Sequence, residues 1–317
     1  MNQPTDINQV RPTSLKHLIG QAHVIQQVEV ALDAAQQDAR KFDHALLVGP
    51  PGLGKSAMCQ VIAEEMATGF HEVLGQALNS PAELNGLLLA AKGRDVVLID
   101  EAHEMRKDAQ TALYLALDKQ RVFVKTGTGS PQGIPIEYFT LLLATTDEFH
   151  LLQPLRDRMR LVLRLDFLAD HELVQVVGQR CLALGWEVEA EVFPEIAQRS
   201  RGTPRLALRL LQSCHRVSRS LGEDRISFEH LRRACELEQL DELGLGPNEQ
   251  AYLRILVQGP ARLNVLASAL GLPTRTVSAV IEAFLIRAGL IAKDHQSIRQ
   301  LTAKGREHVL KSSQETV

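Results

Sequence analysis

The chain has 317 residues, of which 45% are apolar and 23% charged, and its formal net charge is −3 at pH 7. The length exceeds what one compact core supports, so two or three domains are expected. No uninterrupted apolar stretch reaches the ~18 residues of a membrane span, and the N-terminal MNQPTDINQV lacks the pattern of a signal peptide. Four scattered cysteines without a CxxC pair indicate reduced thiols in a cytoplasmic protein.

Residues 1–168 are predicted to form an α/β domain with a parallel sheet. Continuous apolar runs at 44–49, 95–100, 139–146 and 161–165 are typical of strands buried on both faces. Between them, apolar residues recur at helical spacing, for example Val24, Val28 and Leu32. Strands that alternate with helices indicate a layered sheet covered by helices.

Two smaller domains are expected after this one. Residues 169–243 contain only amphipathic helical patterns, and Ser227 is the expected N-cap of the last. Residues 244–317 contain three helical patterns followed by two short apolar runs, which is the order of a winged helix-turn-helix. This segment carries nine Lys and Arg against five Asp and Glu, so either contact with a polyanion or a solvated basic face explains its charge.

The stretch GPPGLGKS at 49–56 matches the phosphate-binding loop GxxxxGK[ST] between a predicted strand and a predicted helix. Its backbone N–H groups would surround phosphate oxygens at the positive end of the helix. Lys55 would reach the β- and γ-phosphates, and the Ser56 hydroxyl would bind Mg²⁺. The expected nucleotide-binding residues of the loop are Gly49, Pro50, Pro51, Gly52, Leu53, Gly54, Lys55, Ser56 and Ala57.

A second motif, VVLIDEAH at 96–103, ends an apolar strand in two adjacent acids. Asp100 is expected to hold Mg²⁺, and Glu101 to orient and polarise the attacking water. Thr146 ends another buried strand and would hold the water or the γ-phosphate, unless it is an ordinary strand residue. His103 completes a DEAH tetrapeptide, but the arginine-rich motif of DEAH helicases is absent, so a local structural role is expected for it.

Two arginines are candidates for stabilising the charge of phosphoryl transfer. Arg158, in LQPLRDRMR, follows Thr146 by twelve residues and is expected to reach away from its own site. Arg205, in RGTPR, begins a helix that could return to the nucleotide of the same chain. For each arginine a surface ion pair is the alternative, and Arg156 is interpreted as support for the turn.

These segments occur in the order found in AAA+ ATPases, and in detail the chain resembles the RuvB family, motors that drive branch migration of Holliday junctions. The resemblance covers about residues 11–306 and includes RPTSLKHLIGQ, GPPGLGKS, VVLIDEAH, PLRDRM and RGTPR. It implies that Thr146 is sensor 1, Arg158 the arginine finger supplied to the neighbouring subunit, and Arg205 sensor 2. It also implies that Val10, Arg11 and Leu168 lie near the nucleotide.

The resemblance further implies ATP and Mg²⁺ as cofactors, a hexameric ring around duplex DNA, and a junction-binding partner, RuvA. It also implies that Lys293 and Arg299 lie on basic positions of the wing that contact DNA. The chain departs from the family at Leu18 and Leu168, where tyrosines are usual, and in the hairpin 124–138 that docks on the partner.

The expected function is therefore that of an ATP-dependent DNA motor in recombination and repair. A protein-remodelling ATPase that has lost DNA translocation is the first alternative, since the docking hairpin is altered. A nucleotide-gated DNA-binding protein without hydrolysis is the second, but the complete hydrolytic set of Lys55, Glu101 and Arg158 argues against it.

Overall fold

The computed structural model describes residue 7 and residues 10–124 and 132–314. They form two compact units, one of residues up to Val176 with Thr203–Arg205, the other of Val177–Gly202 with the residues from Leu206 onward. The central part of the expected docking hairpin, residues 125–131, lies outside the described residues.

The first unit is built on a five-stranded sheet in which every neighbouring pair is parallel. The strand order is β2-β3-β6-β1-β7. Strand bounds are β1 (Ala45–Val48), β2 (Phe70–Leu74), β3 (Val96–Asp100), β6 (Thr140–Thr145) and β7 (Leu161–Arg164). Four of these strands lie in the predicted apolar runs. The edge strand β2 was not predicted, because its residues are partly buried or exposed and form no continuous apolar run.

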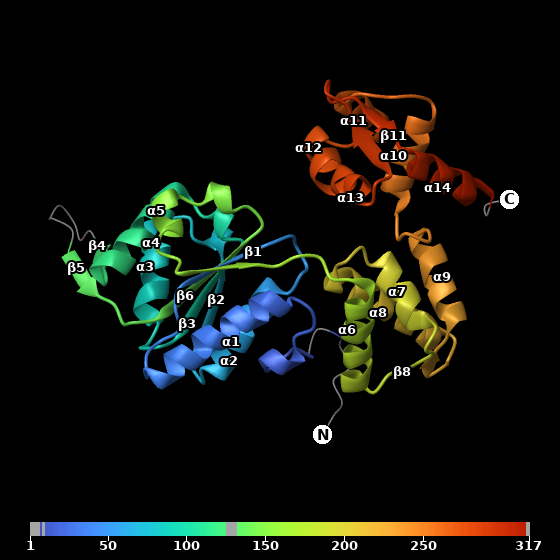
Figure 1. The fold of residues 1–317 in the computed structure, drawn as a ribbon. Coiled ribbons are helices and arrows are strands. Elements are labelled where there is room, and N and C mark those ends of the chain that lie inside the picture. The colour runs from blue at the N-terminus through green and yellow to red at the C-terminus, as the bar shows by residue number, and fades with distance from the viewer. Residues whose placement is uncertain (1–6, 8–9, 125–131, 315–317) are drawn as a thin grey trace. The chain divides into compact units, whose positions relative to one another are not determined.

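Helices cover both faces of this sheet (Figure 1). α1 (Ala22–Gln37) and α2 (Lys55–Glu65) lie on one side, and α3 (Pro81–Ala90) and α4 (Lys107–Lys119) on the other. On the α3 and α4 side, alternate strand residues pack against apolar residues of both helices in one cluster. Complete burial of such side chains stabilises the fold by roughly 1.5–3 kcal/mol each. The predicted parallel α/β architecture is confirmed.

Shorter elements complete the unit. They are the helical turns η1 (Leu15–His17), η2 (Gly75–Ala77), η3 (Ala102–Glu104) and η4 (Glu148–His150), helix α5 (Gln153–Arg156), and the antiparallel strands β4 (Arg121–Val124) and β5 (Gln132–Pro135).

The segment after residue 169 is helical, as predicted. Its helices are α6 (Asp170–Leu184), α7 (Val192–Arg199), α8 (Pro204–Ser220) and α9 (Phe228–Glu238). Ser227 caps α9, and the His230 side chain completes a reciprocal capping box. Two short parallel strands, β8 (Glu187–Val188) and β9 (Arg225–Ile226), are added to the predicted helices.

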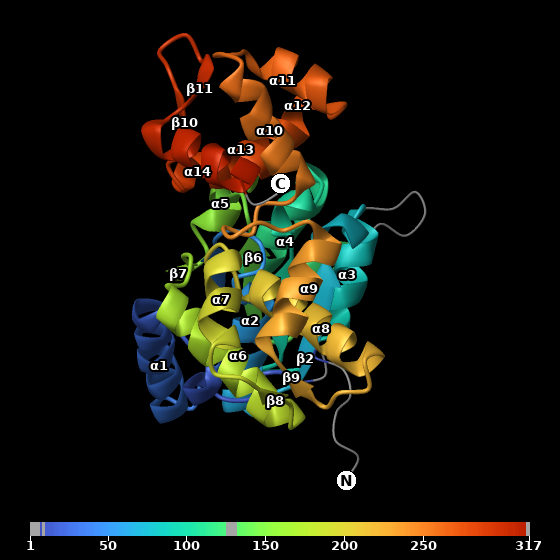
Figure 2. The ribbon, with the colours of Figure 1, turned by 90° about the vertical axis from the view of Figure 1, so that its right-hand side faces the viewer.

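The C-terminal part of the second unit is a winged helix (Figure 2). Its first two helices are α10 (Pro247–Val257) and α11 (Leu263–Leu270). The third helix, Thr274–Arg287, is made of α12 (Thr274–Thr276), the π-helical turn η5 (Val277–Ile281) and α13 (Glu282–Arg287). The wing strands β10 (Ile291–Lys293) and β11 (Arg299–Leu301) and the last helix, α14 (Ala303–Gln314), follow. In the described residues no single helix is long and apolar enough to cross a membrane; α11 and Thr274–Arg287, bent by 107°, satisfy the criteria only as a pair, and both contribute to the apolar core of the winged helix.

Candidate nucleotide site

The phosphate-binding loop joins the carboxyl end of β1 to the first turn of α2. Gly54 caps the helix in the left-handed region with a φ of 93°, a conformation that costs glycine little. A Cβ atom on Gly49 would lie 2.5 Å from the Leu165 carbonyl oxygen, so the loop also needs glycine where it passes β7. The unpaired N–H groups at the start of α2 therefore face the carboxyl edge of the sheet, where they suit an anion.

Lys55 is buried at the first position of α2, with 6% of its surface exposed. Its Nζ donates hydrogen bonds to the carbonyl oxygens of Gly49, at 2.8 Å, and Pro50, at 3.0 Å. Burial lowers the pKa of Lys55, and the nearby carboxylates of Glu101 and Asp100 oppose this. The ammonium group thus lies inside the loop, where phosphate oxygens would replace the carbonyl partners.

Ser56 and Asp100 meet at the same edge, although 44 residues separate them. The Ser56 hydroxyl donates a hydrogen bond of 2.6 Å to Oδ2 of Asp100. A hydroxyl and a carboxylate are hard oxygen donors of the kind that Mg²⁺ takes beside nucleotide phosphates. The pair fits the predicted metal role.

Glu101 follows β3 in a left-handed conformation, with a φ of 48°. This geometry turns its side chain away from the line of the strand, and the Glu101 N–H donates to Oδ1 of Asp100 at 2.9 Å. Its Oε2 is buried without a hydrogen bond, although Nδ1 of His103 lies 3.4 Å away. A strained backbone that supports an unsatisfied carboxylate oxygen is consistent with a water-orienting role.

Sequence reasoning missed the contact between Thr145 and His103. Nδ1 of His103 lies 3.0 Å from Oγ1 of Thr145, which is buried at the end of β6. The Thr145 hydroxyl also accepts the N–H of Asp147, at 3.0 Å. The expected sensor, Thr146, comes one residue after β6 and is exposed at the same edge as Asp100. His103 therefore joins the ends of two strands, and only the adjacency of β3 and β6 could have indicated this.

The segment before α1 in the sequence lies alongside helix α2. Nη1 of Arg11 donates to Oε1 of Gln60 at 3.1 Å, and the Ser14 hydroxyl donates to Glu65 at 2.8 Å. Val10, which directly precedes Arg11 in the sequence, is partly buried. The structure thus places Arg11 along the helix that begins at the phosphate-binding loop.

Leu168 is buried, with 5% of its surface exposed. Its Cγ lies 3.1 Å from the position that a Cβ atom on Gly20 would take, and Gly20 has a φ of 74°. The two places where the chain departs from the usual tyrosines, Leu18 and Leu168, therefore belong to neighbouring segments.

Arg205 is grouped with the first unit. Its backbone N–H donates to the carbonyl oxygen of Gly52 at 3.3 Å. A Cβ atom on Gly52 would lie 2.8 Å from the Cβ of Arg205 and from Cγ2 of Thr203, so this approach also depends on glycine. Arg205 thus lies beside the phosphate-binding loop at the start of its helix, and its contact with the nucleotide of the same chain stays a prediction.

Arg158 lies at the amino-terminal edge of the sheet, opposite the carboxyl edge that carries the phosphate-binding loop. It follows α5 and precedes β7, whose first residue, Leu161, pairs with Ala45 at the start of β1. Nε of Arg158 donates to Oδ1 of Asp118 at 2.7 Å, and a second nitrogen contacts Oδ2 of the same carboxylate. The guanidinium also lies 5.0 Å from the centre of the Tyr114 ring. The arginine is held away from the loop of its own chain.

Arg156 supports the turn locally. Its guanidinium donates to the Gln153 side chain and lies over the Phe149 ring, 5.3 Å from the ring centre. Both partners are within seven residues of Arg156 in the sequence, which agrees with the structural role expected for it.

The wing residues require a correction. Arg299 has 7% of its surface exposed, and its Nε donates to Oε1 of the buried Glu282 at 2.9 Å. Nζ of Lys293 lies 2.7 Å from Oε2 of the same carboxylate, with about a third of the lysine side chain exposed. The Tyr252 hydroxyl also donates to Glu282, at 2.8 Å. Arg299 neutralises a buried acid instead of facing solvent, so the expected DNA contact does not suit its position.

The parallel sheet, the phosphate-binding loop and the acidic strand end define a P-loop ATPase with a helical lid. Three family models match the chain in succession: the P-loop domain of the Holliday junction DNA helicase RuvB at residues 10–165, the RuvB AAA lid domain at 169–241, and the RuvB C-terminal winged helix domain at 242–310. The chain belongs to the RuvB family.

Whole-chain similarity agrees with this. The chain is 38% identical over 291 residues to the Holliday junction branch migration complex subunit RuvB of Clavibacter michiganensis subsp. michiganensis, covering 90% of this chain and 81% of that protein. It is 34% identical to the subunit of the same name from Thermotoga maritima, covering 95% of this chain and 92% of the relative. The solved structure of the Thermotoga maritima RuvB Holliday junction branch migration motor superposes with a TM-score of 0.82, over 94% of this chain and 97% of that one.

Proposed function

We propose that this protein is the ATP-hydrolysing motor subunit of Holliday-junction branch migration, acting in DNA recombination and repair. Two relatives named Holliday junction branch migration complex subunit RuvB match 90% and 95% of this chain. The nucleotide site supports hydrolysis, since its loop, its lysine and both acids at the end of β3 lie together at one edge of the sheet.

The observation that carries the proposal is the separation of Arg158 from this edge. β1 and β7 are parallel and in register from Ala45 with Leu161 to Val48 with Arg164. Three residue steps of a strand span about 10 Å, and the loops at the two ends add to this distance. Arg158 and Gly49 lie beyond opposite ends of these strands. Arg158 therefore suits the γ-phosphate held by a second copy of the chain, and hydrolysis requires assembly.

The residues of the site have distinct parts in this proposal. Lys55 binds phosphate oxygens from inside the loop, and Glu101 orients the attacking water with its unsatisfied oxygen. Thr146 lies at the strand end where it can position that water or the γ-phosphate, as a first sensor. Arg205 contacts the nucleotide from the start of its helix, as a second sensor. Val10, Arg11 and Leu168 would line the nucleotide, with Arg11 held beside α2 by Gln60.

Ser56 and Asp100 would hold Mg²⁺. The metal, when bound with the nucleotide, would offset the negative charge of the phosphates. The Ser56 hydroxyl and the Asp100 carboxylate, which meet at 2.6 Å, would be the oxygen ligands that the chain supplies to it. The described residues contain no group of three or more His, Cys, Asp or Glu suited to a metal, which is consistent with a site completed by phosphates and water.

Contact with DNA would come from the winged helix. Arg262 and Arg275 are exposed at the beginnings of its second and third helices, where a helix-turn-helix contacts the duplex. Lys293 of the wing is partly exposed and remains a candidate for contact with the phosphate backbone. We place these contacts in a hexameric ring around duplex DNA.

A junction-binding partner of the RuvA type would dock on the hairpin of β4 and β5. Phe123 and Ile134 on its described strands are exposed apolar residues, which suit a protein interface. Four free, buried cysteines support a cytoplasmic protein. We keep three domains, at 1–168, 169–243 and 244–317, as the working division of the chain.

The test is the rate of ATP hydrolysis with and without junction DNA, measured at low salt across a range of protein concentration. We expect the rate per subunit to rise with concentration and to increase further with junction DNA, together with branch migration of a labelled junction. Low salt matters because phosphate contacts weaken steeply with salt. Hydrolysis that ignores DNA but responds to a protein partner would indicate a remodelling ATPase instead.

A further inference from the structure

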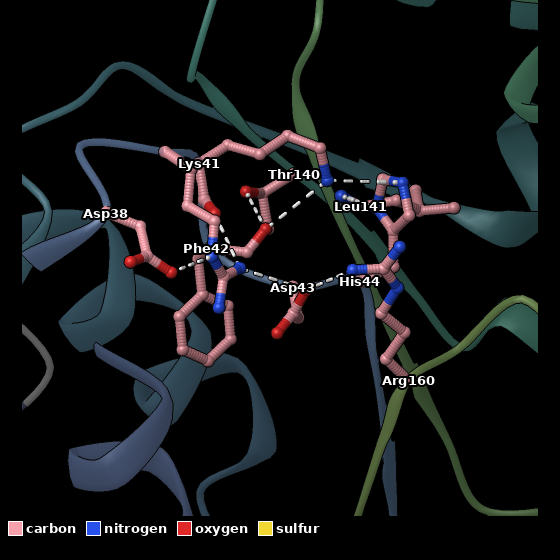
Figure 3. Close-up of polar contacts among 9 residues, drawn as sticks. Asp38, Lys41, Phe42, Asp43, His44, Thr140, Leu141 and Arg160 are labelled. Atoms are coloured by element: carbon pink, nitrogen blue, oxygen red, sulfur yellow. Dashed lines mark hydrogen bonds and ion pairs between the residues drawn. The ribbon is translucent and has the colours of Figure 1, made fainter. Parts of the chain in front are cut away.

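The loop that leads into β1 holds a lysine against a histidine. Lys41 is partly buried, and its Nζ lies 3.4 Å from Nε2 of His44 and 3.4 Å from the carbonyl oxygen of Phe42 (Figure 3). This carbonyl also accepts the Thr140 hydroxyl, at 2.9 Å. The lysine side chain is therefore folded back over its own loop, toward the amino-terminal edge of the sheet.

The hydrogen bond at Nδ1 of His44 determines which nitrogen of this ring carries its proton. The backbone N–H of Leu141 donates to Nδ1 of His44 at 2.8 Å. A backbone N–H can only donate, so Nδ1 carries a lone pair and the proton of the neutral ring is on Nε2. That N–H faces Nζ of Lys41. An ammonium group has no lone pair to accept it, whereas a neutral amine has one.

The surrounding charges favour the same protonation state. Burial lowers the pKa of Lys41 to about 8, and Arg160 and Arg40 lower it as well, while Asp43 opposes them. Burial, aided by Lys41, lowers the pKa of His44 to about 3. At pH 8 about half of Lys41 is therefore a neutral, nucleophilic amine, beside a histidine that stays neutral.

This amine opens into a pocket of about 650 Å³ at the amino-terminal edge of the sheet. The basic residues that line it come from the segments before β1, β3 and β7: Arg40, Lys41, Arg94, Arg158 and Arg160. Only three acids line it with them, Asp43, Asp118 and Asp157. Asp43 accepts hydrogen bonds from both Arg40 and Arg160, each at 3.1 Å. With Lys41 neutral, four arginines still face three carboxylates, and this small positive excess suits a small anion such as a phosphate.

We propose that Lys41 is a modification site that accepts acyl groups from a small anionic donor, an acyl phosphate, whose phosphate is held by the arginines of this pocket. The lone pair of Nζ attacks the acyl carbon and forms a C–N bond. The bond from that carbon to the phosphate oxygen breaks, and its electron pair leaves with the phosphate. The extra proton on the nitrogen passes to solvent, so the products are an Nε-acyl-lysine and inorganic phosphate.

The modification would remove a titrating charge and fill space in the pocket that Arg158 also lines. The inference does not depend on the proposed function, because its test measures the acetylation of Lys41 and not ATP hydrolysis.

The test uses the full-length protein with acetyl phosphate, and mass spectrometry measures the initial rate of acetylation at each lysine between pH 7 and pH 9. Lys107, exposed on α4, is the internal control. At pH 8 a larger fraction of Lys41 than of an ordinary lysine is neutral, which raises its rate of acetylation. An amine of lower pKa is also a weaker nucleophile, which offsets part of this gain. We therefore expect acetylation of Lys41 to be about ten-fold faster than that of Lys107. The rate at Lys41 should level off above about pH 8, and inorganic phosphate should slow Lys41 but not Lys107.

A second arm tests the anion subsite. Arg160→Gln changes a side chain that is three-quarters exposed, so the fold should persist, which circular dichroism checks. We expect several-fold slower acetylation of Lys41 by acetyl phosphate in this variant, and little change with acetic anhydride, which carries no phosphate. Equal rates at Lys41 and Lys107 with acetyl phosphate would overturn the proposal. A fast reaction at Lys41 that neither Arg160→Gln nor phosphate slows would overturn it as well.

Discussion

Both carboxylate oxygens of Asp118 accept hydrogen bonds from one side of the Arg158 guanidinium, its Nε and Nη2, at the edge of the sheet opposite the phosphate-binding loop. The hydrogen bond from Arg158 is the main reason that the pKa of Asp118 lies below its ordinary value. About a quarter of the arginine side chain remains exposed, so it is oriented by the carboxylate and still accessible from outside. This is the arrangement expected of an arginine that acts on a neighbouring subunit.

Mixing two inactive variants tests this directly. Arg158→Ala removes the finger and Lys55→Ala removes phosphate binding, and we expect each alone to lose about 10³-fold or more in ATPase rate. A mixture should recover part of the activity, because some interfaces then pair an intact finger with an intact loop. Arg156→Ala is the matched control and should retain most activity. Mixtures no more active than either variant would assign Arg158 to another role.

Glu101→Gln should separate binding from hydrolysis. The amide cannot accept the proton of the attacking water, so we expect a loss of about 10²–10⁴-fold in the hydrolysis rate. ATP binding should persist, because Lys55 and the loop are unchanged. Fluorescent-nucleotide binding and ATPase rate measure the two effects. Glu104→Gln, three residues along and more exposed, should change neither, and unchanged turnover in Glu101→Gln would remove this residue from the mechanism.

Arg299 and Arg275 should show different defects. Arg299→Ala leaves the buried Glu282 with fewer partners, so we expect a loss of about 3 kcal/mol in the free energy of unfolding, measured with urea. Arg275→Ala changes an exposed residue and should cost less than about 0.5 kcal/mol, but weaken DNA binding at low salt. An Arg299→Ala protein with unchanged stability and much weaker DNA binding would restore the expectation that Arg299 contacts DNA.

The pair of His308 and Asp241 should make stability depend on pH. Nε2 of His308, which is buried, lies 2.9 Å from Oδ2 of Asp241. The hydrogen bond to Asp241 is the main reason that the pKa of His308 is raised. A raised folded-state pKa stabilises the fold fully below the unfolded value of about 6.5, and this contribution is lost as the pH rises through the folded value.

Thermal unfolding of the protein between pH 6 and pH 9 measures this contribution. We expect the melting temperature to fall over that range by more in the native protein than in His308→Gln, whose side chain does not titrate. Arg275→Ala, in which the His308 pair is unchanged, should follow the native protein. Identical pH profiles for the native protein and His308→Gln would exclude the pair as the source.

Much of the candidate site could be predicted from the sequence because its signals are local. The loop GPPGLGKS contains its own turn, lysine and hydroxyl within eight residues, and a buried strand that ends in two acids indicates which edge of the sheet they share. The apolar runs and helical spacings likewise determine the parallel sheet, the helical lid and the winged helix, since buried strands and amphipathic helices differ in period.

Tertiary structure decided what depends on residues far apart in the chain. The Arg158 carboxylate partner lies 40 residues away, and the N–H that orients His44 beside Lys41 lies 97 residues away. Arg299 looked like a surface charge until folding brought it to Glu282. An isolated arginine or lysine has the same sequence signal whether it faces solvent, a carboxylate or a histidine. Its charge and reach are set by the residue type, but its partner is set by how the chain packs.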